Sequence, residues 1–417
     1  MNLIKLATII LALLGSPLFV IIAALGLISF HGVGIDLSAV IIEMSRLTDT
    51  PMLLSLPLFI FAGTLLSASN TPQRLLLFSH SMLGWLPGGL AVISLLVCAF
   101  FTAFTGASGV TILAVGGLLL PALLQDRYPK NFSLGLITSS GSLGLLFPPS
   151  LPLILYGVIS GVRIDQLFLA GILPGILMLS LLIGYSVKTG MTARKNHQRP
   201  KVEFLKGLKA AAWELPLPFI VLGGIYGGIL VAAEAAAVTA LYVVVVEVFI
   251  YRDIKLAQLP KIMVQSMVLF GGILVVLAAS MATTNYLVDQ EIPQRLFELI
   301  RTYITNKYTF LLALNVFLLI VGALLDIFSA LVLIVPLIIP IAEAYDVNLI
   351  HLGIIFLTNL QIGYSTPPIG LNLFMASYRF DRPVLELCAA TLPFLILLLI
   401  SLAAITYFPQ LSLLLIQ

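Results

Sequence analysis

Two short polar clusters interrupt otherwise apolar sequence, and each contains an adjacent pair of prolines. The first is "TSSGSLGLLFPPS" at 138–150, and the second is "LTNLQIGYSTPPIGLN" at 357–372. Proline lacks a backbone N–H and cannot continue a helix interior, so each cluster predicts a broken helix. The break leaves carbonyls unpaired on one half-helix and amides unpaired on the next. A small cation suits the carbonyl end, and an anionic substrate suits the amide end.

The side chains at these breaks are hydroxyls and amides, which offer hard oxygen ligands close to the unpaired backbone groups. In the first break they are Ser139, Ser140 and Ser142, beside Gly141 and Gly144. In the second break they are Thr358, Asn359, Gln361, Ser365, Thr366 and Asn372, with Gly363 and Gly370. A simpler alternative is a pair of proline kinks whose backbone groups are satisfied by local hydroxyls. Because the pattern occurs twice, binding sites are favoured over kinks.

Asp326 is an acid in apolar surroundings, between "NVFLLIVGALL" and "IFSALVLIVPLIIP". An ionisable group at membrane depth is costly, and by default it marks an ion or substrate pathway. Beside Thr358 and Asn359, its carboxylate would complete an oxygen cage suited to sodium. Alternatively, Asp326 caps the helix that follows it, and capping and coordination can coexist. The first half of the chain has "GAS" at 106–108 in this place, so a site there would use backbone and hydroxyl oxygens.

The composition indicates what kind of protein positions these groups. Of 417 residues, 60% are hydrophobic and 9% are charged, and the mean hydropathy is +1.14. Soluble domains average about 25% charged residues, and apolar runs long enough to cross a bilayer recur along this chain. The sequence therefore predicts an all-α polytopic membrane protein. We do not expect an enzyme, because the chain has no Walker A or GxSxG motif and its acids and histidines do not cluster as a catalytic set.

The longest polar stretch, at 188–209, is basic and lies between the two halves of the chain. By the positive-inside rule, this linker is expected to be cytoplasmic. A nucleic-acid site is the rival interpretation, and a short linker between membrane spans disfavours it. Cys98 and Cys388 both lie in apolar segments, so we expect neither a disulfide nor a metal site from them.

Equivalent features recur in the two halves of the chain. One constant shift along the sequence aligns Pro121 with Pro340, Pro148 with Pro367, Pro149 with Pro368, and Pro174 with Pro393. "TPQRLLLF" at 71–78 also corresponds to "IPQRLFEL" at 292–299, and Arg74 and Arg295 in these segments are expected to anchor amphipathic helices at the membrane interface. We therefore predict a first repeat at 1–187, a linker at 188–212 and a second repeat at 213–417.

Each repeat is expected to hold a helical hairpin followed by its broken helix. The hairpins at about 88–125 and 308–345 are centred on "TGASG" and "LDIFSA", and the broken helices span about 132–160 and 350–379. Small and polar tips favour re-entrant hairpins, while two ordinary spans with a short loop are the alternative. With re-entrant hairpins, an odd number of crossings separates equivalent points, so the repeats have inverted topology. Inverted repeats with broken helices are typical of secondary transporters.

These residues resemble the large membrane subunit of the tripartite ATP-independent periplasmic (TRAP) transporters, over essentially the whole chain. The resemblance is carried by "LPLFIFAGTLL" (56–66), "GASGVTILAVGGLLLPALL" (106–124), "LGLLFPPSLPLILYGVISG" (143–161), "LFLAGILPGIL" (167–177), "EAAAVTALY" (234–242) and "IGYSTPPIGLNLFMAS" (362–377). It implies a sodium-driven importer of small organic acids in a bacterial inner membrane, working by an elevator motion. It also implies two partners, a separate small four-helix membrane subunit and a periplasmic substrate-binding protein.

Carried over to this sequence, the resemblance implies sodium sites in both repeats. Their ligands would be Gly106, Ser108, Ser139 and Ser140 in the first, and Asp326, Thr358, Asn359, Gly363 and Thr366 in the second. The organic acid is expected near the proline pairs, at Ser142, Pro148, Pro149, Ser150, Pro367, Pro368 and Asn372. Sodium is the only metal and the only cofactor expected, and no residue is expected to be catalytic. Two alternatives stay open, a stand-alone sodium-coupled carboxylate carrier without a binding protein, and a channel.

Overall fold

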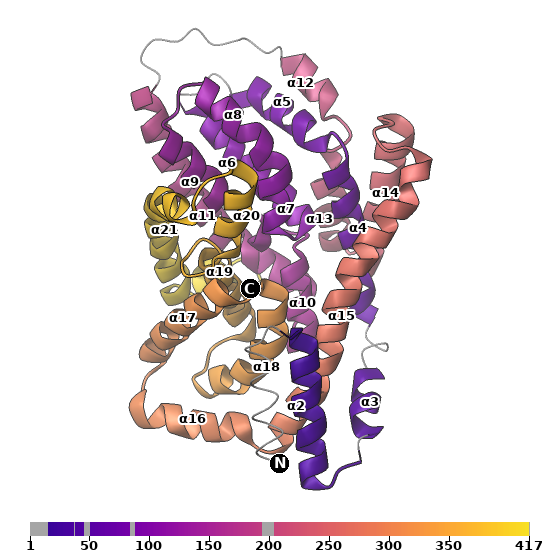
Figure 1. Cartoon of the computed structure of the whole chain (residues 1–417), viewed down its shortest axis with the longest axis vertical. Helices are drawn as coiled ribbons and strands as arrows, with labels where there is room; N and C mark the ends of the chain where they lie inside the picture. The colour runs from indigo at the N-terminus through magenta and orange to yellow at the C-terminus, as the bar shows by residue number, and fades with distance from the viewer. Residues whose placement is uncertain (1–15, 37, 46–50, 84–87, 194–203, 417) are drawn as a thin grey trace.

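The computed structural model describes residues 16–36, 38–45, 51–83, 88–193 and 204–416 (Figure 1). This part of the chain is helical and contains no β-strand. Seven of its helices are long and apolar enough to cross a membrane, or eight if the bent pair around the first proline cluster is one span. The prediction of a helical multi-span membrane protein is confirmed. Residues 194–203 of the expected linker lie outside the described residues.

The first half of the chain forms a series of helices that ends in one long span. They are α2 (Leu18–Val33), α3 (Ser38–Ser45), η2 (Pro51–Leu54), α4 (Ser55–Ala68), α5 (Thr71–Leu83), α6 (Gly89–Thr105), α7 (Ser108–Thr111), η3 (Ile112–Gly116), α8 (Gly117–Gln125), α9 (Lys130–Ser140), η4 (Leu143–Leu146), α10 (Leu151–Ser160) and α11 (Ile164–Ala193). Because α11 continues to Ala193, Lys188 lies on this helix and not in a loop, so the connection between the halves is shorter than the sequence suggests.

The second half of the chain repeats much of this order. Its elements are α12 (Phe204–Ala210), α13 (Pro216–Tyr226), α14 (Ala232–Val244), η5 (Val245–Ile250), η6 (Leu256–Gln258), α15 (Leu259–Asp289), α16 (Ile292–Tyr303), α17 (Lys307–Leu324), α18 (Ile327–Ala344), α19 (Leu349–Gly363), α20 (Leu371–Phe380), α21 (Val384–Tyr407) and α22 (Gln410–Leu413). The halves interlock, because α9 packs against α21, α4 packs against α14, and α2 packs along α15 (Figure 1).

The segment from α6 to α8 folds back on itself. Its two ends lie together beside α11, since a Cβ on Gly190 would lie 2.3 Å from the Cα of Gly88 and 3.1 Å from the Tyr128 hydroxyl. At the opposite end the chain turns at Gly106, whose φ of 64° favours glycine. Near this tip the hydroxyls of Thr102 and Thr111 are 2.7 Å apart. The segment is therefore a hairpin whose arms touch at the tip.

The segment from α17 to α18 is a second hairpin of the same kind. At its open end the Lys307 ammonium donates to the carbonyl of Asp346 at 2.5 Å. Tyr345 also joins the two arms there, because its hydroxyl donates to the Ile304 carbonyl at 2.6 Å and its ring stacks on Phe310 at 4.4 Å between centroids. The arms turn at 325–326, between α17 and α18.

Each hairpin is followed by a helix that breaks at its proline pair. The first runs through α9 and η4, bends by 43° and resumes as α10. The second leaves α19 at Gly363 and resumes as α20 at Leu371. The Pro148–Pro149 and Pro367–Pro368 peptide bonds are both cis. Because proline has no N–H and cannot continue a helix, each pair accounts for the interruption between the two half-helices.

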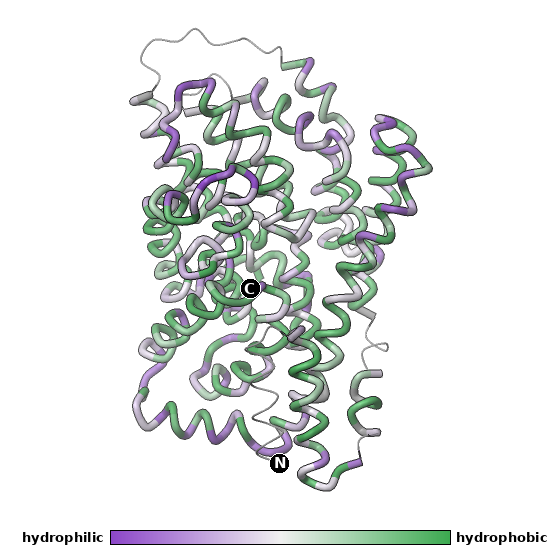
Figure 2. The backbone as a smooth tube through the Cα atoms, viewed as in Figure 1, coloured by the Kyte–Doolittle hydropathy of each residue, from purple (hydrophilic) through white to green (hydrophobic). Residues whose placement is uncertain are grey.

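The two amphipathic helices lie at opposite ends of the long axis of the molecule (Figure 1). Helix α5 packs beside α12 at one end, and α16 packs beside α18 at the other. Along α16, hydrophilic and hydrophobic residues alternate in patches (Figure 2), as expected for a helix with one polar face. These are the two segments that share the Pro-Gln-Arg-Leu sequence.

The interpretation of Arg74 as an interfacial anchor is wrong. Its guanidinium donates to Glu214, to Asp253 and, at 2.8 Å, to Glu247, and the side chains of Glu214 and Glu247 are fully buried. Arg74 therefore fastens α5 to the turn before α13 and to the end of the α14–η5 helix. Arg295, at the corresponding place on α16, is exposed.

Candidate functional site

The tip of each hairpin is packed against the break that follows it. In the first half of the chain the Thr102 hydroxyl donates to the carbonyl of Gly141 at 2.8 Å. In the second, the amide of Gly370 donates to the carbonyl of Ala323 at 3.0 Å. The hydrogen bonds differ in detail, but both join a hairpin tip to backbone that the break leaves without a helical partner.

Glycine is required where these backbones approach each other. A Cβ on Gly144 would lie 2.2 Å from the Ala99 carbonyl oxygen and 2.5 Å from the Ala103 amide nitrogen. A Cβ on Gly363 would lie 2.5 Å from the carbonyl carbon of Gly322. The shift that aligns the two proline pairs also aligns Gly144 with Gly363, and Ala103 with Gly322. The same close approach therefore occurs in both halves of the chain.

The two breaks meet each other at the centre of the molecule. The Ser142 hydroxyl donates to the carbonyl of Gln361 at 3.0 Å. From α20, the Asn372 amide nitrogen lies 3.2 Å from the Ser142 hydroxyl and 3.2 Å from the carbonyl of Thr138. All of these groups are buried. The structure thus brings together Ser142 and Asn372, which the sequence assigned to the substrate.

The first hairpin tip and the first break contain buried hydroxyls whose oxygens are unused. Within the described residues, the hydroxyls of Thr105, Ser108 and Ser139 have no hydrogen-bond partner although each is buried. A buried polar group without a partner is costly, so these oxygens are expected to face a ligand. Ser140 differs, because its hydroxyl already donates to the carbonyl of Ile137 at 3.2 Å. Gly106, at the hairpin tip, packs against Leu151.

The second break offers amide and hydroxyl oxygens of the same kind. Thr358 and Thr366 donate their hydroxyl protons to carbonyls four residues earlier, at 2.7 and 3.0 Å, so both oxygens keep lone pairs for another partner. The side-chain oxygens of Asn359, Gln361 and Asn372 are buried and accept no hydrogen bond from any described residue. These are hard oxygen donors that suit a small cation or a polar substrate.

Asp326 caps α18, as one of the two sequence interpretations predicted. Its Oδ2 accepts hydrogen bonds from the amides of Phe328 and Ser329, both at 3.0 Å. Its side chain is exposed, like those of Pro367 and Pro368, whereas Pro148 and Pro149 are buried. Apolar residues that follow Asp326 in the sequence, such as Ile327 and Ala330, are buried, whereas Asp326 itself lies on the exposed side of the hairpin tip. One carboxylate oxygen remains outside the cap interaction.

The amide ends of the resumed helices bring further predicted residues to this region. Ser150, at the start of α10, is buried and its hydroxyl donates to the carbonyl of Leu145. Asn372 lies in the first turn of α20, and the amide end of a helix carries partial positive charge. Among the described residues, no group of three or more His, Cys, Asp and Glu side chains could hold a metal ion. The side chains gathered here offer oxygen donors, which suit a hard cation.

Several residues at the site were missed by the sequence analysis. Thr102, Thr105 and Thr111 line the first hairpin tip, and Asn315 on α17 contacts Asn359 at 2.7 Å. A polar residue in the apolar run "LLALNVFLL" could have identified Asn315, because an amide at that depth needs a partner. The threonines give no such signal, since threonine is common in membrane helices and can bond its own helix.

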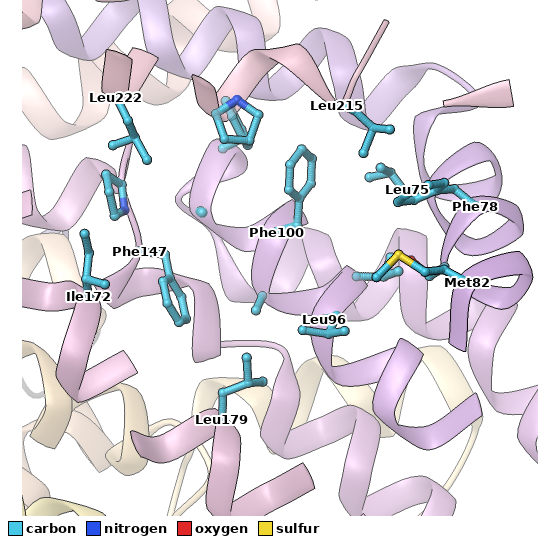
Figure 3. A pocket seen from close by; sticks show the side chains of 17 residues that line it. Leu75, Phe78, Met82, Leu96, Phe100, Phe147, Ile172, Leu179, Leu215 and Leu222 are labelled. Atoms are coloured by element: carbon cyan, nitrogen blue, oxygen red, sulfur yellow. The ribbon is translucent and has the colours of Figure 1, made fainter. Parts of the chain in front are cut away.

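A separate cavity of about 430 Å³ lies between α5, α6, α11 and α13 (Figure 3). It extends to Phe147 and Pro148 at the first break. Apart from Ser79, every described side chain that lines it is apolar. Because such a surface cannot solvate a carboxylate, this cavity is not suited to an organic acid.

Comparison with known proteins gives one consistent result. A family model described as the DctM component of the tripartite ATP-independent periplasmic transporters matches residues 5–411. The chain is 34% identical to the C4-dicarboxylate TRAP transporter large permease protein DctM of Pseudomonas aeruginosa, over 89% of this chain and 88% of that one. It is 32% identical to the sialic acid TRAP transporter large permease protein SiaM of Vibrio cholerae, over 95% of this chain and 93% of that one.

A solved structure has the same overall fold. The crystal structure of the Alcanivorax borkumensis YdaH transporter superposes with a TM-score of 0.59, covering 89% of this chain and 87% of that chain. The two sequences are 15% identical, so the likeness concerns the fold alone.

Proposed function

The chain belongs to the DctM component family of the tripartite ATP-independent periplasmic transporters, and from this membership we propose that it is a sodium-driven subunit that imports a small organic acid. It is a multi-pass protein of the bacterial inner membrane and a transporter permease, not an enzyme. The coupling ion, the substrate and the mechanism are the parts that we propose.

We propose that the halves are inverted repeats. The same contact occurs in both halves of the chain, between Gly144 and Ala103 in the first and between Gly363 and Gly322 in the second. Both residues of this contact are shifted by the number of residues that separates the two proline pairs. The open end of the first hairpin lies beside Gly190 on α11, and that of the second lies beside α16 (Figure 1). These are opposite ends of the molecule, which is the arrangement that inversion requires. Because the linker is basic, we propose that the α12 end is the cytoplasmic one.

The proposal of sodium coupling rests on the buried side-chain oxygens near both breaks that accept no hydrogen bond from the described residues. In the first site we propose Ser108 and Ser139 as ligands, with backbone at Gly106 and Ser140. In the second we propose Asn359, Thr358 and Thr366, with backbone at Gly363 and with Asp326 at the tip. All donors are oxygen, and the unpaired carbonyl ends of α9 and α19 add to them, as in other sodium-coupled carriers.

We propose that the organic acid binds between the two breaks. Ser142 and Asn372 meet there, and Asn372 has a buried oxygen that no described residue satisfies. Ser150 lies at the start of α10, where the helix amides favour an anion. The backbones around Pro148 and Pro149, and around Pro367 and Pro368, would shape the two sides of this site. Both relatives named above transport carboxylic acids by name, which fits this substrate class.

An elevator motion fits the packing of the hairpins on the broken helices. Hairpin tips and breaks are joined by hydrogen bonds in both repeats, so they would move as one body. Helix α4 packs on both α14 and α15, and these three helices would form the scaffold. The partners would be a small four-helix membrane subunit and a periplasmic substrate-binding protein, as the tripartite family name implies.

Uptake by proteoliposomes tests the proposal. Vesicles would contain this chain with its small subunit, and the binding protein would be added outside with a radiolabelled organic acid. We expect saturable uptake that requires an inward sodium gradient and the binding protein, and that stops when choline replaces sodium. Uptake without the binding protein would instead indicate a stand-alone carboxylate carrier. Uptake that does not saturate would indicate a channel, and uptake that ignores sodium would refute the coupling.

A further inference from the structure

Asn359 is held by two hydrogen bonds that leave only its oxygen free. Its amide nitrogen donates to the side-chain oxygen of Asn315 at 2.7 Å and to the carbonyl of Ile355 at 2.8 Å. A side-chain amide has two donor hydrogens, so both are used. The residue is fully buried, and its Oδ1 accepts nothing from the described residues. The nitrogen contacts therefore determine where the free oxygen points.

Asn315 is itself fixed by a chain of polar groups that lie on four helices, α17, α21, α19 and α22. Its amide nitrogen donates to the Thr406 hydroxyl on α21 at 3.0 Å. The carbonyl of Thr406 lies 3.3 Å from Nε2 of His351, and Nδ1 of His351 lies 3.1 Å from the Ser412 hydroxyl. Because a carbonyl can only accept, Nε2 carries the proton of His351. The chain runs from Asn359 on α19 to α22.

This chain of polar groups is absent at the matching positions of the first repeat. In the alignment set by the proline pairs, Asn315 corresponds to Leu96, Thr406 to Val187 and His351 to Phe132. Phe132 packs against the rings of Tyr128, Tyr185 and Phe394 instead. The shared fold is therefore built equally well with apolar residues at these places. Buried polar groups are retained at a cost in desolvation, which indicates a role at the second site.

We infer that Asn315 is a positioning residue for the sodium site of the second repeat, acting through Asn359. Its oxygen fixes the rotamer and the amide orientation of Asn359, so that Oδ1 is presented to the ion. Accepting a hydrogen bond from the Asn359 amide also polarises that amide and makes its oxygen a better ligand. Asn315 does not contact the ion. The inference rests on the sodium coupling proposed above.

Asn315→Leu tests this role and reproduces the residue that the first repeat has at this place. In the reconstituted three-part system we expect the sodium concentration for half-maximal uptake to rise about tenfold, since losing a residue that orients a ligand typically costs 10- to 100-fold in affinity. The maximal rate at saturating sodium should remain within a factor of about two. Asn315→Asp keeps an acceptor for Asn359, and we expect it to restore most of the sodium affinity.

The double variant with Asn359→Ala separates positioning from general packing. If Asn315 acts through Asn359, then adding Asn315→Leu to Asn359→Ala causes no further change in half-saturating sodium. Thr406→Val is a milder variant that keeps both asparagines, and we expect a rise of about threefold. Sodium-dependent protection against thermal unfolding, measured in detergent, gives the same comparison without transport.

Three results would overturn the positioning role. In the first, Asn315→Leu and Thr406→Val leave half-saturating sodium unchanged and lower only stability. In the second, Asn315→Leu further weakens sodium binding in the Asn359→Ala background. In both cases wild-type uptake still requires sodium, so the proposed function stands. In the third, wild-type uptake does not require sodium, and the proposed function fails together with this role.

Discussion

The Ser142 hydroxyl donates to the carbonyl of Gln361 at 3.0 Å, and the shift that aligns the two proline pairs also aligns these two residues. If the halves are inverted repeats, as proposed above, residues at corresponding places touch only where both lie close to the axis that relates the halves. Under that proposal the contact lies at the axis of the molecule. Asn372 joins it from α20, and together these groups form a buried polar core between the breaks.

Ser142→Ala should lower the apparent affinity for the organic acid without changing the apparent affinity for sodium. The variant removes the donor to the Gln361 carbonyl and the acceptor of the Asn372 amide, and leaving such buried groups unpaired costs about 1–3 kcal/mol. We expect the KM for the organic acid to rise roughly tenfold while half-saturating sodium stays constant. Initial rates of uptake over a matrix of substrate and sodium concentrations check this.

Ser160→Ala is the matched control for that change. Its hydroxyl also donates to a backbone carbonyl, that of Tyr156, but this hydrogen bond stays within α10 and does not join the two halves of the chain. We expect wild-type KM. An equal rise in KM for both variants would show that the effect comes from helix stability and not from the contact between the halves.

The sequence alone located the breaks and the hairpins because both depend on local chemistry. Proline pairs stop a helix wherever they occur, and glycines such as Gly144 and Gly363 mark close backbone approach. The interval between the proline pairs then related one half to the other. These features need no knowledge of long-range packing, so they were predictable from the residues themselves.

The sequence could not predict the hydrogen-bond and ion-pair partners of individual side chains, because these partners are far apart along the chain. Arg74 meets Glu214 and Asp253 at separations of 140 and 179 residues, and Asn359 meets Asn315 at 44. Asp326 shows a second limit. The hydropathy of its neighbours reports that the hairpin arms are apolar, but it does not tell which side of the tip is covered by other helices.

Gly363→Ala should destabilise the protein because the tip of the second hairpin has no room for a Cβ. The added atom would lie 2.5 Å from the Gly322 backbone, and forcing a methyl group into packed surroundings costs about 1–3 kcal/mol. Thermal unfolding in detergent should therefore occur several degrees lower, with reduced uptake. Gly144→Ala should behave in the same way, since it meets the Ala99 carbonyl oxygen at 2.2 Å.

Gly184→Ala on α11 controls for the general effect of replacing a helical glycine. A Cβ there would meet no atom within 4 Å, so the change should be neutral or stabilising by up to about 1 kcal/mol. If Gly363→Ala unfolded at the wild-type temperature, the close packing of α17 on the second break would be contradicted.

Arg74→Gln should destabilise the protein in a manner that depends on pH. Burial raises the pKa of Glu214, and the Arg74 guanidinium limits that rise. Without Arg74 the pKa of Glu214 rises further, so the folded state holds a proton that the unfolded state, with a pKa near 4.3, releases. Stability then falls as the pH rises from about 4.5 through the folded pKa. We expect a loss of about 3–5 kcal/mol at neutral pH and partial recovery near pH 5.

Arg295→Gln provides the comparison for the arginine cluster. It removes the corresponding arginine of α16, which is exposed, and should change stability by less than about 0.5 kcal/mol at any pH. Thermal unfolding of both variants between pH 5 and pH 8 distinguishes them. A pH-independent loss in Arg74→Gln would mean that packing of the arginine stem, and not its charge, stabilises α5.

Asp326→Asn should lower the apparent affinity for sodium while the N-cap of α18 is kept. Asparagine is as good an N-cap as aspartate, so its side-chain oxygen can still accept from the amides of Phe328 and Ser329. What the variant removes is the negative charge at the hairpin tip. We expect half-saturating sodium to rise about tenfold with little change in the unfolding temperature, since loss of a charged ligand lowers cation affinity more than it changes the fold.

The decisive comparison for this charge uses the other end of the same helix. Asp346 is also exposed and lies just beyond the last turn of α18, so Asp346→Asn changes the net charge equally without touching the tip. Uptake titrated with sodium at constant ionic strength should respond to Asp326→Asn and not to Asp346→Asn. Equal shifts would show that both acids act only by raising the local sodium concentration, because screened surface charge acts at either place. No shift in Asp326→Asn would remove Asp326 from the sodium site and leave it as a helix cap, since the hydrogen bonds that define the cap do not need its charge.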